Sequence, residues 1–495
     1  MAVDSKKLAR GPITVTVVLV TVMHTLDVSI ANVVLPHIQG SIAASQDQIS
    51  WVLTSYIVAT AIMTAPTPFL AGLFGRRRFF FWSAVGFIAA SVLCGMATSL
   101  SQLVLFRILQ GAAGAGLLPL SLTILLDAYP PEEHPKASAL YSFGAVIGPV
   151  LGPTLGGYIT DALSWRWVFY VNLPVGILAL LGIVFFIPDV PRKTRQTFDW
   201  FGFVALSLGV GALQLALDRG HSLDWFNSVE IITEVAIAAL AAYIFIVHSA
   251  TAKKPFIDLR LFADRNCVAG AISAAFITGI LYSTLALLPT YLQVLMGMPV
   301  YTAGLLLAVR GGATMITMYL LSHYYALLGP RLIQVVGALC SAIGLYQVSQ
   351  FNLSVGMVDI CISNIFLGVG LAAISVPATA LAFVTLPTEL RAEASTLMSL
   401  TRNMGGSIGI SYIVTRLARE TQINHAQLTE NITPFTNNLP ELWDWTSTLG
   451  ASTLNVELTR QAAAIAYYSN FYLMMWGALL LLPIGWMFRL PKPQT

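Results

Sequence analysis

The chain has 495 residues, of which 56% are hydrophobic and only 10% are charged, and its mean hydropathy is +0.76. Soluble globular chains carry about a quarter of charged residues, so this composition excludes a soluble protein and indicates one that faces lipid. The formal net charge of +3 is small for this length and gives no case for nucleic-acid binding, which requires a strongly basic face. The four cysteines form no CxxC pair, so neither a disulfide framework nor a metal site is supported.

Apolar runs long enough to span a bilayer as helices, about 20 residues each, recur along the whole chain. About fourteen can be recognised, at 13–35, 51–70, 79–98, 102–126, 138–160, 166–187, 198–217, 229–249, 267–290, 301–322, 331–350, 356–382, 393–416 and 466–488. The runs are continuous rather than alternating, which favours helices over barrel strands. We therefore predict an all-α polytopic membrane protein with 14 transmembrane helices, the first of them not cleaved.

An internal similarity divides this series of helices. Residues 130–152 and 387–409 share a proline, a glutamate, an Ala-Ser pair and two glycines in the same register. Repeats in the same orientation build transporters from two halves. We predict two six-helix pseudo-repeat halves, 1–190 and 261–495, joined by two extra linking helices in 191–260.

Basic residues alternate between loops and set the expected orientation. Arg76-Arg77-Arg78 and Arg192-Lys193-Arg195 fall on the same side as both termini. The positive-inside rule places this side in the cytoplasm. Residues 418–465, rich in Gln, Asn and Thr, then form a long outer loop, whose part from 454 to 468 has helical character.

Asp27 is an acid in the middle of the first apolar run, where an unpaired carboxylate is strongly disfavoured. Helix counting places it about 20 Å along its span, at a depth comparable to that of Arg107, which lies about 8 Å into a span entering from the opposite side. The two side chains are therefore expected to pair and to couple transport to protons. A fixed pair that only pins two helices is the alternative. His24 lies on the same helix face and serves either as a proton relay or as a packing residue.

The run 138–160 contains glycines at every fourth position, which leaves a smooth helix face for close packing. Two prolines in the same run each remove a backbone hydrogen bond and allow bending. This conformational motif consists of Gly144, Gly148, Pro149, Gly152, Pro153, Gly156 and Gly157.

Further polar and aromatic residues within the apolar runs are predicted to bind substrate. They are Asn32, Tyr56, Gln110, Tyr282, Tyr291 and Arg310. Arg310 either attracts anionic substrates or is a snorkelling, helix-pinning arginine. The sequence has no GxxxxGK[ST] loop and no HExxH, so we expect no ATP-driven pump, no enzyme, no metal and no cofactor, only a proton gradient.

Several of these stretches together resemble the major facilitator superfamily, specifically fourteen-span drug:proton antiporters of the EmrB/QacA type. LDVSIANVVLP resembles the first-span signature, with Asp27 as its acid. LVLFRILQGAAGAG resembles the fourth-span motif, with Arg107, Gln110 and Gly111 in place, and GAVIGPVLGPTLGG resembles the fifth-span antiporter motif. WRWVFYVNLPVG and LDRG also recur in this subfamily.

The loop between the second and third spans departs from the family pattern. PFLAGLFGRRR keeps Gly75 and the basic residues Arg76, Arg77 and Arg78, but Gly72 stands where the family has an acid. The charge-relay part of this cytoplasmic loop motif is therefore in doubt.

The resemblance implies proton-driven export of amphipathic drugs or toxic compounds across the bacterial inner membrane. It also implies a periplasmic adaptor protein and an outer-membrane channel as partners, and no nucleic acid. A dedicated exporter of an endogenous metabolite, such as a siderophore or fatty acid, fits the same motifs. A non-transporting membrane sensor or scaffold is the alternative from another class, and the intramembrane charges argue against it.

The predicted orientation can be tested by cysteine accessibility. In a cysteine-free variant, a cysteine introduced at position 435 should react with an impermeant reagent from the outer side, because the Lys/Arg asymmetry puts the segment there. Labelling only from the cytoplasmic side would overturn the topology.

Overall fold

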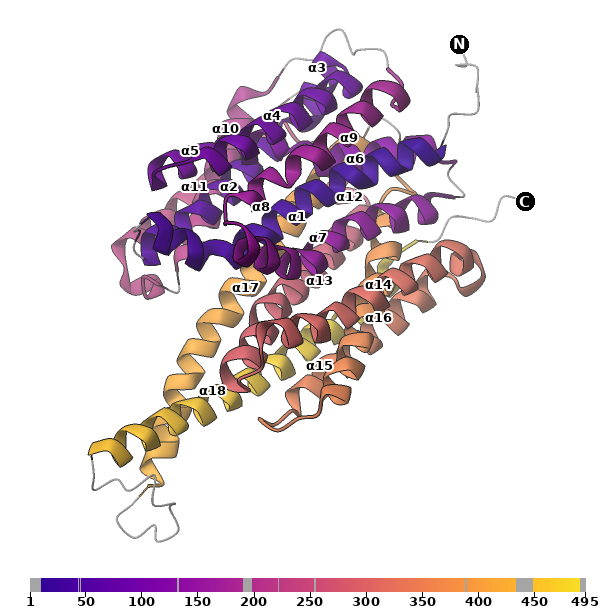
Figure 1. Ribbon diagram of the computed structural model, residues 1–495. Helices are drawn as coiled ribbons and strands as arrows, with labels where there is room; N and C mark the ends of the chain where they lie inside the picture. Colours follow the sequence, from indigo (N-terminus) through magenta and orange to yellow (C-terminus); the bar gives the residue numbers. More distant parts are fainter. Residues whose placement is uncertain are drawn as a thin grey trace.

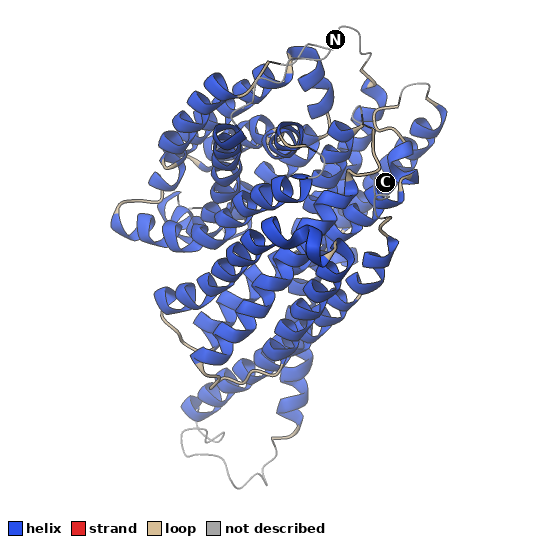
Figure 2. Ribbon diagram, turned by 90° about the vertical axis from the view of Figure 1, so that its right-hand side faces the viewer, coloured by secondary structure: helices blue, strands red, loops and turns tan. Residues whose placement is uncertain are grey.

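The computed structural model describes residues 10–42, 44, 46–130, 133–189, 198–220, 222–252, 255–387, 390–432 and 448–489. All regular structure in these ranges is helical, and none of their residues forms a strand (Figure 2). The fold class is therefore all-α, as the continuous apolar runs predict.

The helices before residue 190 form the first bundle. They are α1 (Arg10–Ile42), α2 (Gln46–Thr64), α3 (Thr67–Phe74), α4 (Arg76–Met96), α5 (Leu100–Gly114), α6 (Leu117–Ala128), α7 (His134–Ala162), α8 (Trp167–Tyr170) and α9 (Asn172–Phe186). Two linking helices follow, α10 (Trp200–Arg219) and α11 (Val229–Thr251), joined through a short 3-10 turn.

The helices after residue 259 form the second bundle, which lies beside the first (Figure 1). They are α12 (Arg260–Ala263), α13 (Arg265–Thr290), α14 (Val300–Leu328), α15 (Pro330–Ser349), α16 (Met357–Ala382), α17 (Arg391–Glu430), α18 (Thr448–Leu479) and α19 (Leu481–Met487). A π-helical turn, Tyr291–Leu295, continues α13 beyond Pro289.

Among the described residues, eleven helices are long and apolar enough to cross a membrane, or up to twelve if α2 and α3 count as one span bent by 60°. The bend falls at Ala65-Pro66, where a proline interrupts the helical hydrogen bonds. Helices α7 and α17 occupy the two remaining predicted spans but are not among these, so the count of fourteen and the two-repeat layout stay predictions.

The glycine face of α7 packs against α1. A Cβ built at Gly148 would overlap the backbone of Thr25 and lie 2.5 Å from the Leu26 nitrogen, and one at Gly152 would overlap the Ser29 side chain. No atom lies within 4 Å of such a Cβ at Gly157. The absence of side chains therefore sets the distance between the two helices.

The second bundle repeats this kind of contact between α17 and α13. A Cβ at Gly409 would lie 2.6 Å from the Cα of Gly279, and one at Gly405 would overlap the backbone of Ala275. Gly405 and Gly409 are the residues that match Gly148 and Gly152 in the internal sequence similarity.

Helix α17 contacts both the first bundle and a linking helix. Near its start, Ser395 donates a hydrogen bond to the Pro119 carbonyl at 3.0 Å. Further along, the linking helix α10 contacts it through Gln214, whose Nε2 donates to the Ser407 hydroxyl at 2.7 Å. The linking helices therefore contact the second bundle as well as the first.

The segment 418–465 differs from the predicted outer loop. Helix α17 continues to Glu430 and α18 begins at Thr448, so every described residue of the segment up to 430 and from 448 is helical. The two extensions project together beyond the other helices (Figure 1), linked by His425 and Asn455 at 2.9 Å. The predicted span ends where the sequence becomes polar, but a helix does not have to end there. Helix α17 continues because this stretch has no Gly or Pro and because side chains one turn apart pair, as Arg416 and Glu420 do at 2.7 Å.

The helix contact at Gly148 can be tested by thermal unfolding of the purified protein in detergent. Gly148→Ala should lower the melting temperature, because the added methyl group overpacks the α1–α7 contact, which typically costs about 1–3 kcal/mol. Gly157→Ala is the matched control and should not lower it, since its Cβ meets open space and alanine favours the helix over glycine. Equal melting temperatures for the two variants would contradict the packing role.

Candidate functional site

Asp27 lies inside the first bundle, in the middle of α1, with only 2% of its surface exposed. Its Oδ2 accepts a hydrogen bond from Arg107 Nη1 of α5 at 2.8 Å, and its Oδ1 accepts one from Gln110 Nε2 of the same helix at 2.8 Å. The carboxylate and the guanidinium therefore form a direct, fully buried ion pair rather than one mediated by water.

Arg107 is held in place from several sides. Its Nε donates to the Val52 carbonyl of α2 at 3.1 Å, its Nη1 also donates to Gln110 Oε1 at 2.8 Å, and its guanidinium lies 4.4 Å from the centre of the Tyr56 ring. These contacts fix the planar group opposite the carboxylate. Nη2 has no partner among the described residues.

The close approach of α5 to α2 is what allows Arg107 to reach the site. Gly111 lies directly on α2, and a Cβ there would overlap the Tyr56 carbonyl and lie 2.9 Å from Thr60 Oγ1. Gly111 stands next to Gln110 in the fourth-span motif, so the motif combines the polar groups with the glycine that positions them.

Asn172 donates a further hydrogen bond to Asp27 and was not among the predicted site residues. It begins α9, and its Nδ2 donates to Asp27 Oδ1 at 2.7 Å and to Ser91 Oγ of α4 at 3.0 Å. Asp27 thus ties α1 to α5 and α9. The signal was present in the sequence, since Asn172 is the one amide side chain in the mainly apolar and aromatic stretch from Trp167 to Gly176.

His24 lies one helical turn before Asp27 and is buried. Its Nε2 is 3.2 Å from the Tyr56 hydroxyl, and its ring stacks on Phe87 at 5.7 Å between centroids. His24 therefore reaches the pair through Tyr56, whose ring covers Arg107, and has no direct hydrogen bond to Asp27.

The remaining predicted substrate residues lie elsewhere. Tyr282 lies against α17, where a Cβ at Gly406 would lie 2.5 Å from its ring. The Tyr291 hydroxyl donates to the Asn352 carbonyl at 3.0 Å, and Arg310 is buried among the helices of the second bundle.

Three predicted residues have side chains outside what the structure describes. They are Asn32 in α1 and Pro149 and Pro153 in α7.

The cytoplasmic loop motif connects α3 and α4. Gly75 has a φ of 87°, a left-handed conformation that favours glycine. Arg76 forms an ion pair with Asp127 at the end of α6, and Arg77 donates to the Val184 carbonyl, whereas Arg78 is exposed. The carboxylate that the loop lacks at Gly72 is therefore supplied by α6.

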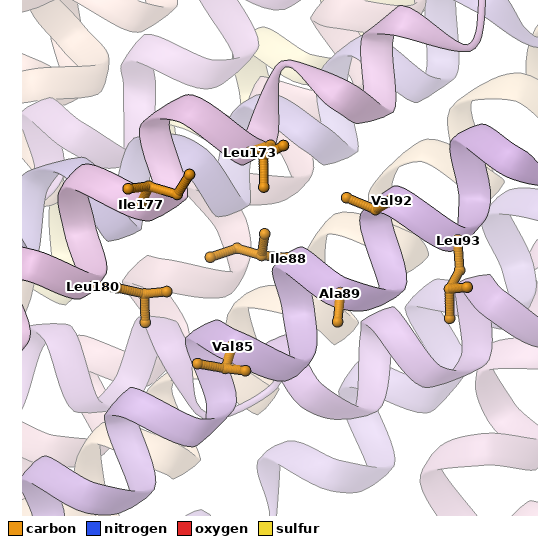
Figure 3. Close-up of a pocket in the computed structure, with 8 residues that line it drawn as sticks. All are labelled: Val85, Ile88, Ala89, Val92, Leu93, Leu173, Ile177 and Leu180. Carbon is orange, nitrogen blue, oxygen red and sulfur yellow. The ribbon is translucent and has the colours of Figure 1, made fainter.

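A groove of about 470 Å³ lies between α4 and α9 (Figure 3). All eight lining residues are apolar: Val85, Ile88, Ala89, Val92, Leu93, Leu173, Ile177 and Leu180. The side chains that line the groove offer no group that can exchange a proton. Within the described ranges, no cluster of three His, Cys, Asp or Glu residues could hold a metal ion.

The arrangement can change its bonding with protonation. An ionised Asp27 accepts three hydrogen bonds and attracts Arg107, whereas a protonated carboxyl loses that attraction. Because these bonds link three helices, the protonation state of Asp27 affects how α1 is held against α5 and α9.

Comparisons with known proteins agree with these features. The sequence profile of the Major Facilitator Superfamily matches residues 17–410. The chain is 33% identical over 488 residues to the multidrug export protein EmrB of Escherichia coli (strain K12), covering 97% of this chain and 95% of EmrB. It is 34% identical over 498 residues to the fatty acid resistance protein FarB of Neisseria gonorrhoeae, covering 98% and 97%.

Solved structures share the fold at low identity. The proton:xylose symporter XylE superposes with a TM-score of 0.61 at 15% identity, over 96% of each chain. A bacterial homologue of the lysosomal transporter Spinster gives a TM-score of 0.58 at 16% identity, over 98% of each. The protein belongs to the Major Facilitator Superfamily and is an integral membrane transporter.

Proposed function

We propose that the protein is a proton-driven antiporter that exports amphipathic drugs or toxic compounds across the bacterial inner membrane, with both termini in the cytoplasm. The observation that carries this proposal is the buried Asp27–Arg107 pair, because an ionisable pair inside a membrane is a functional feature by default. The names of the relatives EmrB and FarB, a multidrug export protein and a fatty acid resistance protein, support export.

The proposed cycle uses the pair as the coupling element. When the site faces outward, a proton neutralises Asp27 and weakens its hold on Arg107 and on any cationic group of the substrate, which then leaves. When the site faces inward, the proton departs and the pair re-forms. Arg107 Nη2, Asn172 Oδ1 and His24 Nδ1 have no partner among the described residues, so the cluster has free groups with which to rearrange.

Export of one endogenous product is the second candidate, and FarB favours a fatty acid as that product. A deletion strain tested against a compound panel, with metabolites profiled in the medium, separates the two. Sensitivity to many compounds supports the broad exporter, and a single retained metabolite supports the dedicated one.

Asp27→Asn should abolish proton release on addition of substrate to proteoliposomes with an imposed pH gradient. Asparagine keeps the shape and can still accept from Gln110 and Asn172, but it cannot titrate. Asp161→Asn, an exposed carboxylate at the end of α7, is the control and should transport normally. If Asp27→Asn moves protons and substrate like the unmodified protein, Asp27 only pins the helices.

Removal of the charge leaves Arg107 buried without its partner, which typically costs about 3–5 kcal/mol. The Asp27→Asn sample must therefore first be shown to elute as a folded protein in size-exclusion chromatography. The double variant Asp27→Asn with Arg107→Gln, which buries no charge at this site, should recover stability without recovering coupling.

We also propose that the projecting part of α17 and α18 docks a periplasmic adaptor, which in turn reaches an outer-membrane channel. Leu449 and Val456 are 77% and 68% exposed and lie seven residues apart, so they share one face of α18. An apolar stripe with this spacing suits a helical partner.

Leu449→Ser together with Val456→Ser should abolish drug resistance in cells while sparing proton-coupled transport in proteoliposomes, where no adaptor is present. Ala451→Ser, exposed on the same helix, is the control and should keep resistance. Replacing 425–455 with a short Gly/Ser linker should reproduce the loss. Unchanged resistance in both variants would exclude docking at this site.

A further inference from the structure

The second bundle contains a buried positive charge without a counter-charge. Arg310 lies ten residues into α14, about 15 Å along the helix, and is only 6% exposed. Its Nη1 donates to the Thr284 hydroxyl of α13 at 2.8 Å, which is its single side-chain hydrogen bond among the described residues. The guanidinium points inward to α13, so it does not snorkel to the membrane surface.

No carboxylate among the described residues pairs with Arg310. Between Arg265 and Leu386 the sequence contains one acid, Asp359, which is exposed at the start of α16. It stands eight residues, about 12 Å of helix, before Leu367, the nearest residue of α16 that lines the Arg310 cavity. A charge buried without a partner is strongly unfavourable, whereas a bound anion would offset that penalty.

A small cavity adjoins the guanidinium. Residues of α13, α14, α15 and α16 line it: Ile277, Ile280, Leu281, Thr284, Arg310, Ser341, Leu367, Leu371 and Ile374. It has about 20 Å³ of room for the centre of a water-sized particle, enough for roughly one such particle. The glycine at 368 lets α16 lie directly against α14, since a Cβ there would overlap the Arg310 carbonyl.

The polar groups on the cavity wall are hydrogen-bond donors. Thr284 already donates its own hydroxyl hydrogen to the Leu281 carbonyl at 2.8 Å and accepts from Arg310. Ser341 is 5% exposed, and its hydroxyl makes no hydrogen bond to the described residues, nor do the other N–H groups of Arg310. The wall thus combines unused donors with apolar side chains, which suits an anion and not a cation.

We propose that this cavity binds one halide-sized anion, with chloride as the abundant ligand, held by the Arg310 guanidinium and the Ser341 hydroxyl. The cavity is too small for a substrate molecule in this structure. The anion makes the second bundle neutral at this depth, as the Asp27–Arg107 pair does in the first. The inference goes beyond the proposed function and does not depend on it.

The test measures thermal unfolding of the full-length protein in detergent while chloride replaces gluconate at constant ionic strength. The melting temperature should rise with the logarithm of chloride concentration above the dissociation constant, because a ligand that binds only the folded state stabilises it. Bromide should act like chloride. Equal melting temperatures in chloride and gluconate would overturn the proposal.

Two variants assign the effect to the cavity. Arg310→Gln should show no chloride-dependent rise and should be more stable than the unmodified protein in gluconate, since it buries no charge. Arg265→Gln, which removes an exposed arginine of α13, should keep the full rise. A full rise in Arg310→Gln would place the anion elsewhere and overturn the assignment.

Ser341→Ala keeps the charge and carries the test if Arg310→Gln does not fold. This variant should need a higher chloride concentration for the same rise in melting temperature. If the chloride concentration that gives half of the rise is unchanged, Ser341 does not bind the anion. Dodecanoate, a fatty acid anion, tests whether the cavity binds a carboxylate instead of a halide. An Arg310-dependent rise with dodecanoate and none with chloride would show that the cavity opens to a carboxylate, and would overturn the halide assignment.

Discussion

The ion pair between Asp27 and Arg107 is the interaction on which the arrangement of the first bundle depends. Both side chains are almost completely buried, so each charge is stable there only because the other is present. The requirement reaches beyond the two residues. Arg107 needs Gly111 beside it to bring α5 onto α2, and Asp27 needs Asn172 at the start of α9 to complete its hydrogen bonds.

The two bundles share a way of packing but differ in charge. In each, glycines at matching sequence positions bring one helix into backbone contact with another, α7 with α1 and α17 with α13. Smooth contacts of this kind contain few interlocking side chains, so they suit surfaces that must slide. Among the described residues the one buried acid, Asp27, belongs to the first bundle, whereas the buried Arg310 of the second bundle has no acid beside it. The two proposals, proton coupling and anion binding, therefore concern different bundles.

The linking helices α10 and α11 extend the fold in one direction, and the projecting ends of α17 and α18, here called the hairpin, extend it in another. Helix α10 contacts α2 through Asp218, which accepts a hydrogen bond from Thr54, and contacts α17 through Gln214. Any change in the relative position of the bundles must therefore alter polar contacts of α10. The hairpin of α17 and α18 is continuous with helices that pack in the second bundle, so a partner bound at its tip is mechanically connected to them.

The sequence alone determined the helical class, most spans, the acid and its partner, because burial in lipid demands long apolar helices and makes an intramembrane charge conspicuous. It indicated helical character for 454–468, which lies within α18, Thr448–Leu479. It did not reveal Asn172 as a partner of Asp27, the pairing of Arg76 with Asp127, or the continuation of α17 to Glu430. Only the tertiary structure decided these features. A hydropathy profile averages the apolarity of residues that are neighbours in the sequence. The hydrogen bonds at Asp27 and Arg76 join residues that are distant in sequence, so such a profile does not detect them. It also does not detect a polar helix that continues beyond the membrane.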